Sequence, residues 1–328
     1  MKHHANSEPA TEVSPGSALK KSSLRIFFTG FGMGTADLVP GVSGGTIAFI
    51  FGIYETLINT IKHLTGPVLQ LILRGKLIQA FREIPFGFII PLATGLFAAI
   101  FTLSKLIAWL LTEHPVFLWS FFFGLVLASI VIVAKRVGHW SAANILACIV
   151  SATGTYFLVG AVPVETPNTL PWIFGSGAMA IIAMILPGIS GSFILLILGK
   201  YSQILAAVNN RDFITLLVFI AGCAVGIGVF SRALSFLFKH YHDVTIAILT
   251  GFLVGSLRKV WPWKEAIITR VNSHGEVVPV VERNLLPAIE PATFAALALI
   301  LAGVGLMAYF QRFESSKDKP KTEKIVNA

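Results

Sequence analysis

Long apolar segments separated by short polar stretches dominate the pattern of hydrophobic and polar positions along this chain. At least six of them approach the roughly 20 residues that a helix needs to cross a hydrocarbon core about 30 Å thick. The pattern predicts full membrane-spanning helices at about 86–111, 116–134, 142–162, 213–238, 243–257 and 288–310. We therefore expect an all-α polytopic membrane protein, because helices satisfy their own backbone hydrogen bonds in lipid.

Two further apolar segments are interrupted near their middle. Residues 26–62 are broken at 37–45, and a segment that starts near residue 170 is broken at 187–192. The helix-breaking residues there are Pro40, Gly41, Pro187 and Gly188. Each segment is expected to form two half-helices that meet at a turn, a re-entrant hairpin. After the first of them, residues 63–85 predict an amphipathic helix on the membrane surface.

The same order of elements occurs twice, which indicates an internal repeat. Residues 40–54 align without gaps on residues 187–201, at an offset of 147, and eight of the fifteen positions are identical. Further matches follow at an offset of 127: Gly95, Ser104, Lys105, Gly124 and Ser129 correspond to Gly222, Ser231, Arg232, Gly251 and Ser256. The surface helix, present only in the first half, accounts for the change of offset. An odd number of full spans in each half predicts that the second half is inverted relative to the first, a recurrent design of secondary transporters.

The repeat and the basic residues together predict an orientation. The chain divides into a polar tail (1–24), a first membrane repeat (25–163), a second membrane repeat (164–311) and a basic tail (312–328). The groups expected in the cytoplasm are Lys20, Lys21, Arg25, the surface helix, Lys135, Arg136 and the basic tail, so both termini would be cytoplasmic. The loops at 112–115 and 160–169 carry no Lys or Arg and would be external. One loop disagrees: residues 258–287 carry five basic residues yet fall outside, so either this loop serves a function or the number of crossings is off by one.

Composition agrees with a membrane protein and excludes other classes. Only 12% of the 328 residues are charged and 55% are hydrophobic, whereas soluble domains have roughly 25% charged residues. The net charge of +9 comes from basic residues at segment ends, where they meet anionic lipid, so no nucleic-acid partner is expected. Cys148 and Cys223 lie in apolar segments without a CxxC spacing, which predicts neither a disulfide nor a zinc site. Residues 1–24 lack the apolar core of a signal peptide, so the first membrane segment is expected to be retained.

The two broken helices form the best candidate binding site. Irregular backbone within a membrane must be buried in protein or line a wet cavity, so the two turns should face inward. A helix N-terminus presents free N–H groups and the positive end of its dipole, which suit an anionic oxygen. Ser43 and Ser190 are expected to cap the following helices, while the nearby glycines leave N–H groups uncovered. The predicted phosphate-binding residues are Ser43, Gly44, Gly45, Ser190, Gly191 and Ser192. Alternatively, the glycines only let helices pack closely.

Four ionisable residues inside or beside the apolar segments are further candidates. Lys105 and Arg232 occupy equivalent repeat positions and are predicted to offer a cation to an anionic head group from each side. Alternatively, both reach the membrane surface along their stems. Asp37 and Glu55 have no acidic counterpart in the second half, and they are predicted to bind a proton or a sodium ion and couple transport to its gradient. Either could instead be a capping or interfacial residue. No other cofactor is expected.

A membrane enzyme is the rival class. Ser231 and Arg232, followed by His240 and Asp243, are similar to an element of lipid phosphatases that cleave prenyl diphosphates, but both spacings differ from that family. A Pro-Ser-Gly-His element, a metal-binding HExxH, a phosphate-binding loop and a nucleophile elbow are all absent from the sequence. We therefore predict no catalytic residues, no metal site and no enzymatic activity.

The first broken segment carries a distinctive resemblance. Residues 32–46, together with 187–192, resemble the bacterial polyprenyl-phosphate transporters of the PopT type, and the likeness extends over roughly residues 24–312. It implies a flippase of the inner membrane that moves undecaprenyl phosphate, the carrier lipid of peptidoglycan and other envelope glycans, from the outer to the cytoplasmic leaflet.

The candidate residues fit such a substrate. A phosphate head group needs helix N-termini and a cation, while the prenyl tail can stay in the surrounding membrane lipids. The two half-sites are expected to be unequal, because Ser192 stands where the first motif has Gly45. A small-anion channel or exchanger and a scaffold without transport activity are the alternatives, and the sequence leaves the oligomeric state open.

Overall fold

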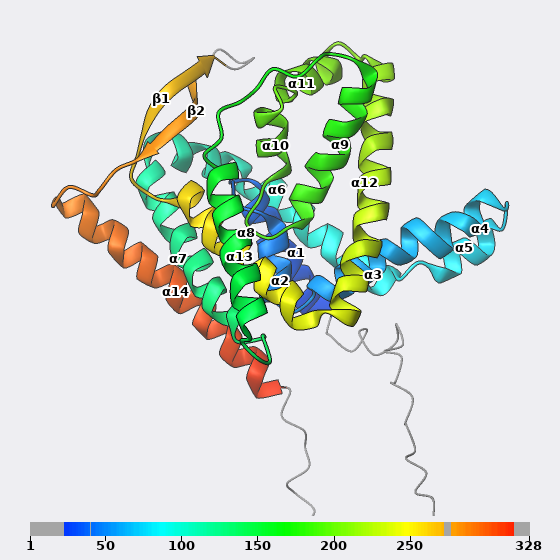
Figure 1. Cartoon of the computed structure of the whole chain (residues 1–328), viewed down its shortest axis with the longest axis horizontal. Helices are drawn as coiled ribbons and strands as arrows, with labels where there is room; N and C mark the ends of the chain where they lie inside the picture. Colours follow the sequence, from blue (N-terminus) through cyan, green and yellow to red (C-terminus); the bar gives the residue numbers. More distant parts are fainter. Residues whose placement is uncertain (1–22, 40, 272–276, 318–328) are drawn as a thin grey trace, which may run out of the picture.

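The computed structural model describes residues 23–39, 41–271 and 277–317, which form a bundle of helices with one β-hairpin (Figure 1). The first half contains α1 (Ser23–Asp37), α2 (Gly44–Ile50), α3 (Tyr54–His63), a π-helical turn η2 (Leu64–Val68), α4 (Leu69–Leu73), α5 (Leu77–Glu83), α6 (Phe86–Glu113), α7 (Pro115–Ala134) and α8 (Ala142–Leu158). The second half contains α9 (Leu170–Ile185), α10 (Gly191–Ile197), α11 (Tyr201–Asn209), α12 (Phe213–His240), α13 (His242–Val260), β1 (Lys264–Val271), β2 (Val277–Asn284) and α14 (Pro291–Lys317).

The two halves contain helices of similar order and length. Helices α6 and α12 are both 28 residues long, and their first and last residues are separated by the same offset of 127. At the offset of 147, two pairs of glycines share a left-handed backbone that other residues rarely adopt. These are Gly41 (φ 82°) with Gly188 (φ 86°), and Gly52 (φ 64°) with Gly199 (φ 67°).

Those glycines also correct the prediction for the broken segments. Each segment forms three helices with two breaks rather than two half-helices, because the chain bends again at Gly52 and Gly199. The second bend is 115° between α2 and the helix that follows, and 106° between α10 and α11. Pro40, predicted at the first break, lies outside the described residues.

Two other segments differ in detail from the expectation. The single surface helix predicted at 63–85 is instead a projecting hairpin, in which Gly75, with φ 72°, separates α4 from α5 (Figure 1). The loop at 258–287 contains an antiparallel β-hairpin that the sequence pattern did not predict, within a protein that is mostly helical, as expected. A short strand pair is accommodated here because it lies between α13 and α14, outside the apolar spans.

Helices α7 and α13, which are equivalent in the repeat, contact each other and run antiparallel. The ammonium group of Lys264, just beyond the end of α13, lies 3.7 Å from the ring centroid of Trp119 near the start of α7. At the other end, the backbone N–H groups of Gly138 and His139, just beyond α7, donate to Asp243 at the start of α13.

The two halves interlock around this pair. The last helix of the first half, α8, packs along α13, and the last helix of the second half, α14, packs along α7. Equivalent glycines allow these contacts, since a Cβ atom at Gly124 would meet the carbonyl oxygen of Ile300 and one at Gly251 would meet that of Cys148. Small residues at such contacts are typical of membrane helices.

The outer helices present apolar side chains to their surroundings. Among the described helices, α6, α7, α12 and α14 are long and apolar enough to cross a membrane, and the two bent pairs raise the number of candidate spans from four to as many as six. Of these four, α7 is the most enclosed: 56% of its most apolar stretch is buried, compared with 17–22% in the other three helices. Phe101, Leu146 and Leu301 are exposed on α6, α8 and α14, which is expected of side chains that face lipid.

Candidate functional site

The two glycine-containing turns meet inside the molecule. The hydroxyl of Ser43, before α2, donates to the carbonyl oxygen of Met184 at 3.0 Å. The backbone N–H of Gly188, in the second turn, donates to the hydroxyl of Thr46 at 3.0 Å. We call this contact between residues 41–46 and 184–190 the motif junction. Ser43, Thr46 and Gly188 are buried, so both turns face inward, as the sequence predicts.

At the start of α2, the protein's own side chains occupy the backbone N–H groups. Ser43 caps the helix as predicted, accepting a hydrogen bond from the N–H of Gly45 at 3.1 Å. A carboxylate oxygen of Asp37 accepts from the N–H of Gly44 at 2.7 Å. The expectation that these N–H groups are uncovered was therefore wrong, because the end of α1 folds back and places an anion there. The capping alternative for Asp37 is confirmed.

The start of α10 is different. Ser190 makes no capping hydrogen bond to the backbone, contrary to the prediction, and its hydroxyl pairs with that of Ser192 at 2.8 Å. Met184 stands where the first half has Asp37, so no carboxylate reaches this helix end from the preceding helix. The two half-sites are thus unequal, and Ser192 is exposed.

Both motifs also depend on glycine for close packing. A Cβ atom at Gly45 would meet the carbonyl oxygen of Ile185, and one at Gly191 would lie 2.6 Å from that of Ala180. Close helix packing, which is the alternative to phosphate binding at these residues, therefore explains glycine at both positions.

Lys105 and Arg232 have different surroundings. Lys105 is exposed on α6 and has no hydrogen bond or ion pair within the described part of the chain. The guanidinium of Arg232 donates to the carbonyl oxygens of Gly228 and Thr65, each at 2.6 Å, and so ties α12 to the π-helical turn. The two cations share no partner, and the structure does not bring them into one cavity.

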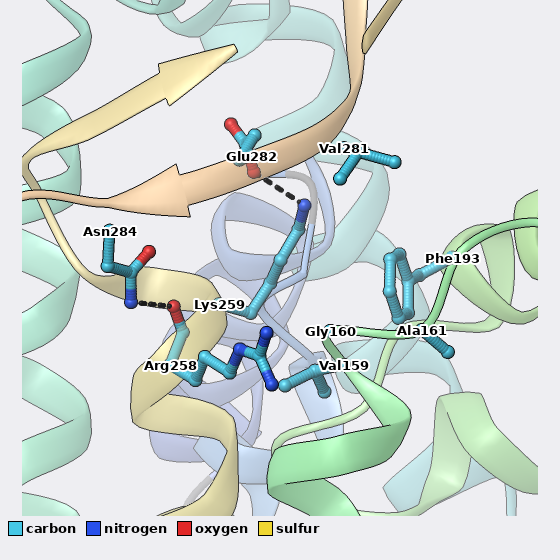
Figure 2. A pocket seen from close by; sticks show the side chains of 9 residues that line it. All are labelled: Val159, Gly160, Ala161, Phe193, Arg258, Lys259, Val281, Glu282 and Asn284. Carbon is cyan, nitrogen blue, oxygen red and sulfur yellow. Dashed lines mark hydrogen bonds and ion pairs between the residues drawn. The ribbon is translucent and has the colours of Figure 1, made fainter. Parts of the chain in front are cut away.

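A basic cluster lies between the end of α13 and the β-hairpin. Its residues were not among the candidates predicted from the sequence. We define it as Arg258, Lys259, Lys264 and Glu282. Figure 2 shows the ammonium group of Lys259, which donates to a carboxylate oxygen of Glu282 at 2.7 Å. The ammonium group of Lys264 lies 3.6 Å from the same oxygen. The side chain of Lys264 is only 7% exposed, and its nitrogen has no hydrogen-bond partner among the residues that the structure describes.

Burial and charge set the protonation of this basic cluster. Burial lowers the pKa of Lys264 to about 8, although the charge of Glu282 partly opposes this shift. Burial alone would raise the pKa of Glu282, but the two neighbouring lysines outweigh it and the pKa is lowered. At neutral pH the basic cluster therefore holds more positive than negative charge away from water.

The basic cluster borders a small pocket and the first motif. The pocket is lined by Val159, Gly160, Ala161, Phe193, Arg258, Lys259, Val281, Glu282 and Asn284 (Figure 2). Its volume of about 20 Å³ is enough for roughly one water molecule. The stem of Lys259 passes over the first turn, since a Cβ atom at Gly41 would lie 2.7 Å from its Cγ. The one signal of this site in the sequence was the basic loop at 258–287, which disagreed with the charge pattern.

Comparisons with known proteins agree with this architecture. Residues 33–278 match the model of a family described as undecaprenyl phosphate translocase-like. The chain is 44% identical over 297 residues to a polyprenyl-phosphate transporter of Vibrio cholerae, covering 88% of this chain and 96% of that protein. It is 32% identical over 251 residues to a polyprenyl-phosphate transporter of Staphylococcus aureus, covering 71% and 84%. No solved structure matches the chain.

The chain belongs to the undecaprenyl phosphate translocase-like family. The resemblance inferred from the first motif is thereby confirmed, and the names of the relatives indicate a transporter rather than an enzyme. With its apolar helices, this member of the family is a multi-pass membrane protein.

In this family member, a buried lysine that the sequence analysis passed over has a structural role. Lys200 is fully buried at the bend before α11, where the first half has Ile53. Its ammonium group donates to the carbonyl oxygens of Thr166 and Pro167, each at 2.9 Å, and to the side-chain oxygen of Asn168 at 2.6 Å. Three acceptors satisfy all three N–H bonds, so this lysine anchors the segment before α9.

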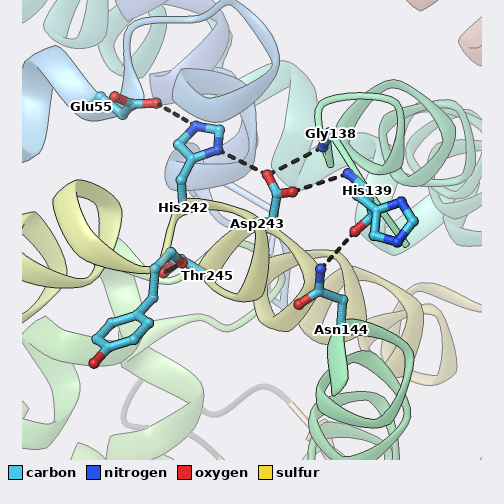
Figure 3. A network of polar contacts seen from close by, with 8 residues as sticks. Glu55, Gly138, His139, Asn144, His242, Asp243 and Thr245 are labelled. Carbon is cyan, nitrogen blue, oxygen red and sulfur yellow. Dashed lines mark hydrogen bonds and ion pairs between the residues drawn. The ribbon is translucent and has the colours of Figure 1, made fainter. Parts of the chain in front are cut away.

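The remaining candidate, Glu55, joins a polar network between the halves of the transporter. In Figure 3, His242 lies between Glu55 and Asp243, with its ring nitrogens 3.9 Å and 3.3 Å from their carboxylate oxygens. Asp243 also accepts the N–H groups of Gly138 and His139 at 3.2 Å and 3.0 Å. This network lies at the opposite end of α13 from the basic cluster, so each end of the helix has its own group of charges.

Proposed function

We propose that this protein is a flippase that moves undecaprenyl phosphate from the outer to the cytoplasmic leaflet of the bacterial inner membrane, so that the carrier lipid is reused in cell-envelope synthesis. The observation that carries the proposal is the similarity, over most of the chain, to two polyprenyl-phosphate transporters. Desolvated cations beside the motif junction suit a phosphate head group, while the apolar outer helices suit a prenyl tail that stays in lipid.

The proposed topology is an inverted repeat with both termini in the cytoplasm. Antiparallel α7 and α13, from equivalent positions of the two halves, support this arrangement. In this orientation the network around Asp243 faces the cytoplasm and the basic cluster faces outward. The head group would then enter from the side of the β-hairpin.

We assign the path of the head group to the motif junction and to the two predicted cations. The residues proposed to contact phosphate there are Ser43, Gly44, Gly45, Ser190, Gly191, Ser192, Lys105 and Arg232. Because Asp37 already fills the start of α2, the hydroxyl pair of Ser190 and Ser192 is the more open half-site in this conformation.

Coupling to a proton or sodium gradient is assigned to Asp37 and Glu55. Each carboxylate joins two elements in this conformation, Asp37 through α2 and Glu55 through His242. Binding a proton would weaken either contact, and a gradient could in this way favour one conformation over the other.

The test is leaflet-resolved uptake of a short-chain polyprenyl phosphate into liposomes that contain the purified protein, with chloride flux recorded in parallel. We expect the wild type to move the lipid without chloride. Arg232→Ala and Lys105→Ala should each slow it about tenfold or more, since each tenfold change in rate corresponds to about 1.4 kcal/mol. Arg232→Lys is the matched control that keeps the charge.

The other outcomes separate the alternatives. Chloride flux with the lipid left in its original leaflet would identify a small-anion channel or exchanger. Movement of neither solute would leave the scaffold role. Lipid movement at the wild-type rate in both alanine variants would keep the transporter but remove Lys105 and Arg232 from its path.

A further inference from the structure

The basic cluster holds an excess of positive charge that the described residues of the protein do not balance. Arg258, Lys259 and Lys264 contribute three positive charges, and Glu282 contributes the one negative charge in the cluster. Lys259 and Glu282 are each 15% exposed and Lys264 is 7% exposed, so water offers these three groups little compensation. An anion with two charges would neutralise this excess.

Lys264 lacks the hydrogen bonds that a buried ammonium group requires. It has three N–H donors, yet its nearest anionic oxygen, on Glu282, is 3.6 Å away and beyond hydrogen-bond distance. The face of Trp119 partly replaces these bonds, with its ring centroid 3.7 Å from the ammonium nitrogen. Burial lowers the pKa of this ammonium group, as expected of a cation held away from water. Lys200, which has three acceptors, shows how the same protein satisfies a buried lysine elsewhere.

Glu282 occupies the place that an anionic ligand would take. One of its oxygens contacts both lysines, at 2.7 Å and 3.6 Å, as a phosphate oxygen does when it bridges two cations. The carboxylate is carried by β2 of the hairpin, not by the helix that carries Lys259. Lys264 is on β1 of the same hairpin, so a rotation of the Glu282 side chain, rather than a movement of the whole hairpin, would free both lysines without disturbing the helical bundle.

The surroundings favour a lipid phosphate over a free ion. Phe193 lies beside Lys259, with its ring centroid 5.1 Å from the ammonium nitrogen, and Trp119 lies beside Lys264. The guanidinium of Arg258 lies over the ring of Tyr156 at 4.5 Å. Each cation is therefore flanked by an aromatic ring, which places apolar surface next to the position of the head group.

We propose that Arg258, Lys259 and Lys264 receive the phosphate monoester head group of the lipid on the side of the β-hairpin, and that Glu282 holds the two lysines until the phosphate displaces it. This assignment rests on the proposed function and specifies where the substrate first binds. A phosphate monoester carries close to two negative charges at neutral pH, which matches the excess charge of the basic cluster. It also explains why a loop expected outside the membrane is basic.

The site is tested by measuring, with titration calorimetry, the affinity of the purified full-length protein in detergent for farnesyl monophosphate. We expect Lys264→Gln to weaken binding about tenfold or more, because it removes a charged hydrogen-bond donor from a buried site. Lys264→Arg should keep most of the affinity. Glu282→Gln should tighten binding several-fold, because the competing carboxylate is lost, and this gain cannot result from misfolding. Arg283→Gln is the control, since Arg283 is the next residue of β2 but is exposed and paired with Glu265.

Two further ligands and the transport assay complete the design. Farnesol, which lacks the phosphate, should not bind, and inorganic phosphate should bind more weakly than the lipid phosphate. Inorganic phosphate that binds while farnesyl monophosphate does not would overturn the lipid as the source of the head group. Weaker binding in Glu282→Gln would overturn the displacement of that carboxylate.

The liposome assay separates the two proposals. A wild type that moves the lipid, with Lys264→Gln and Glu282→Gln binding and transporting like it, would overturn this site and leave the flippase intact. A wild type that neither binds nor moves the lipid would overturn the proposed function, and the site with it.

Discussion

Single residues of the first motif serve the contact between helices before they serve any ligand. Asp37 and Ser43 already occupy the N–H groups of Gly44 and Gly45. Gly45 is also where the start of α2 meets the carbonyl oxygen of Ile185 at the end of α9. A substitution at Gly45 can therefore distinguish two roles of this glycine. If it serves close packing, the substitution should lower stability, and if it serves phosphate binding, the substitution should lower affinity.

Gly45→Ala should destabilise the protein by about 1–3 kcal/mol, because a Cβ atom would push α2 away from backbone that has little freedom to move. The matched control is Gly154→Ala on α8, where nothing lies within 4 Å of the added atom. This control should be stabilising by up to about 1 kcal/mol, because alanine favours the helix over glycine. Reversible unfolding in mixed micelles measures both. A Gly45→Ala protein of normal stability that no longer binds phosphate would instead show that the glycine serves the ligand.

At the scale of elements, among the described residues, the projecting hairpin α4–α5 occurs only in the first half, as the β-hairpin occurs only in the second. Its exposed face carries Leu73, Leu77, Ile78 and Phe81, with exposed fractions between 62% and 78%. Gln79, Arg82 and Glu83 lie on the other side of α5. Such a two-sided short helix is typical of elements that lie in the plane of a membrane surface.

A spin label at Ile78→Cys should therefore be buried about 5–10 Å into the boundary between head groups and acyl chains. The label at Gln79→Cys, on the opposite face of α5, should be accessible to water. Relaxation by oxygen and by a water-soluble nickel complex measures the depth. The chain has only two cysteines, Cys148 and Cys223, so a cysteine-free background is simple to make. Equal accessibility to the nickel complex at both positions would contradict a membrane-bound hairpin.

At the scale of the whole molecule, the two halves exchange their last helices and so are intertwined. Each contributes its last helix to the other, α8 to α13 and α14 to α7. Neither half can therefore bury its own penultimate helix alone. The antiparallel pair α7 and α13 also gives the proposed inversion a direct test, because equivalent helix ends must then lie on opposite sides of the membrane.

Glu113→Cys and His240→Cys place a thiol at equivalent ends of α6 and α12. In intact cells, a membrane-impermeant maleimide should label the first and leave the second unlabelled, because the proposed topology puts residue 113 outside and residue 240 in the cytoplasm. Permeabilised cells, in which both should react, provide the control. Labelling of both thiols, or of neither, in intact cells would contradict the inverted repeat.

The sequence by itself determined the membrane class, most helix positions and the repeat. These depend on local properties: the length of apolar segments, and glycine and proline at the turns. Two features were missed for the same reason. The bends at Gly52 and Gly199 lie within apolar runs without proline, so no local signal marks them. The alternation of polar and apolar residues in the short β-hairpin is a weak signal beside long apolar helices.

The contacts that form the candidate site were decided only by the tertiary structure. Ser43 and Met184 are 141 residues apart, and Lys259 and Glu282 come from different elements. Asp37 fills the start of α2 because α1 folds back, which the spacing of seven residues to Gly44 does not predict. The charge of residues 258–287 was visible in the sequence, but whether those side chains are solvated, paired or buried depends on the elements that the fold brings around them.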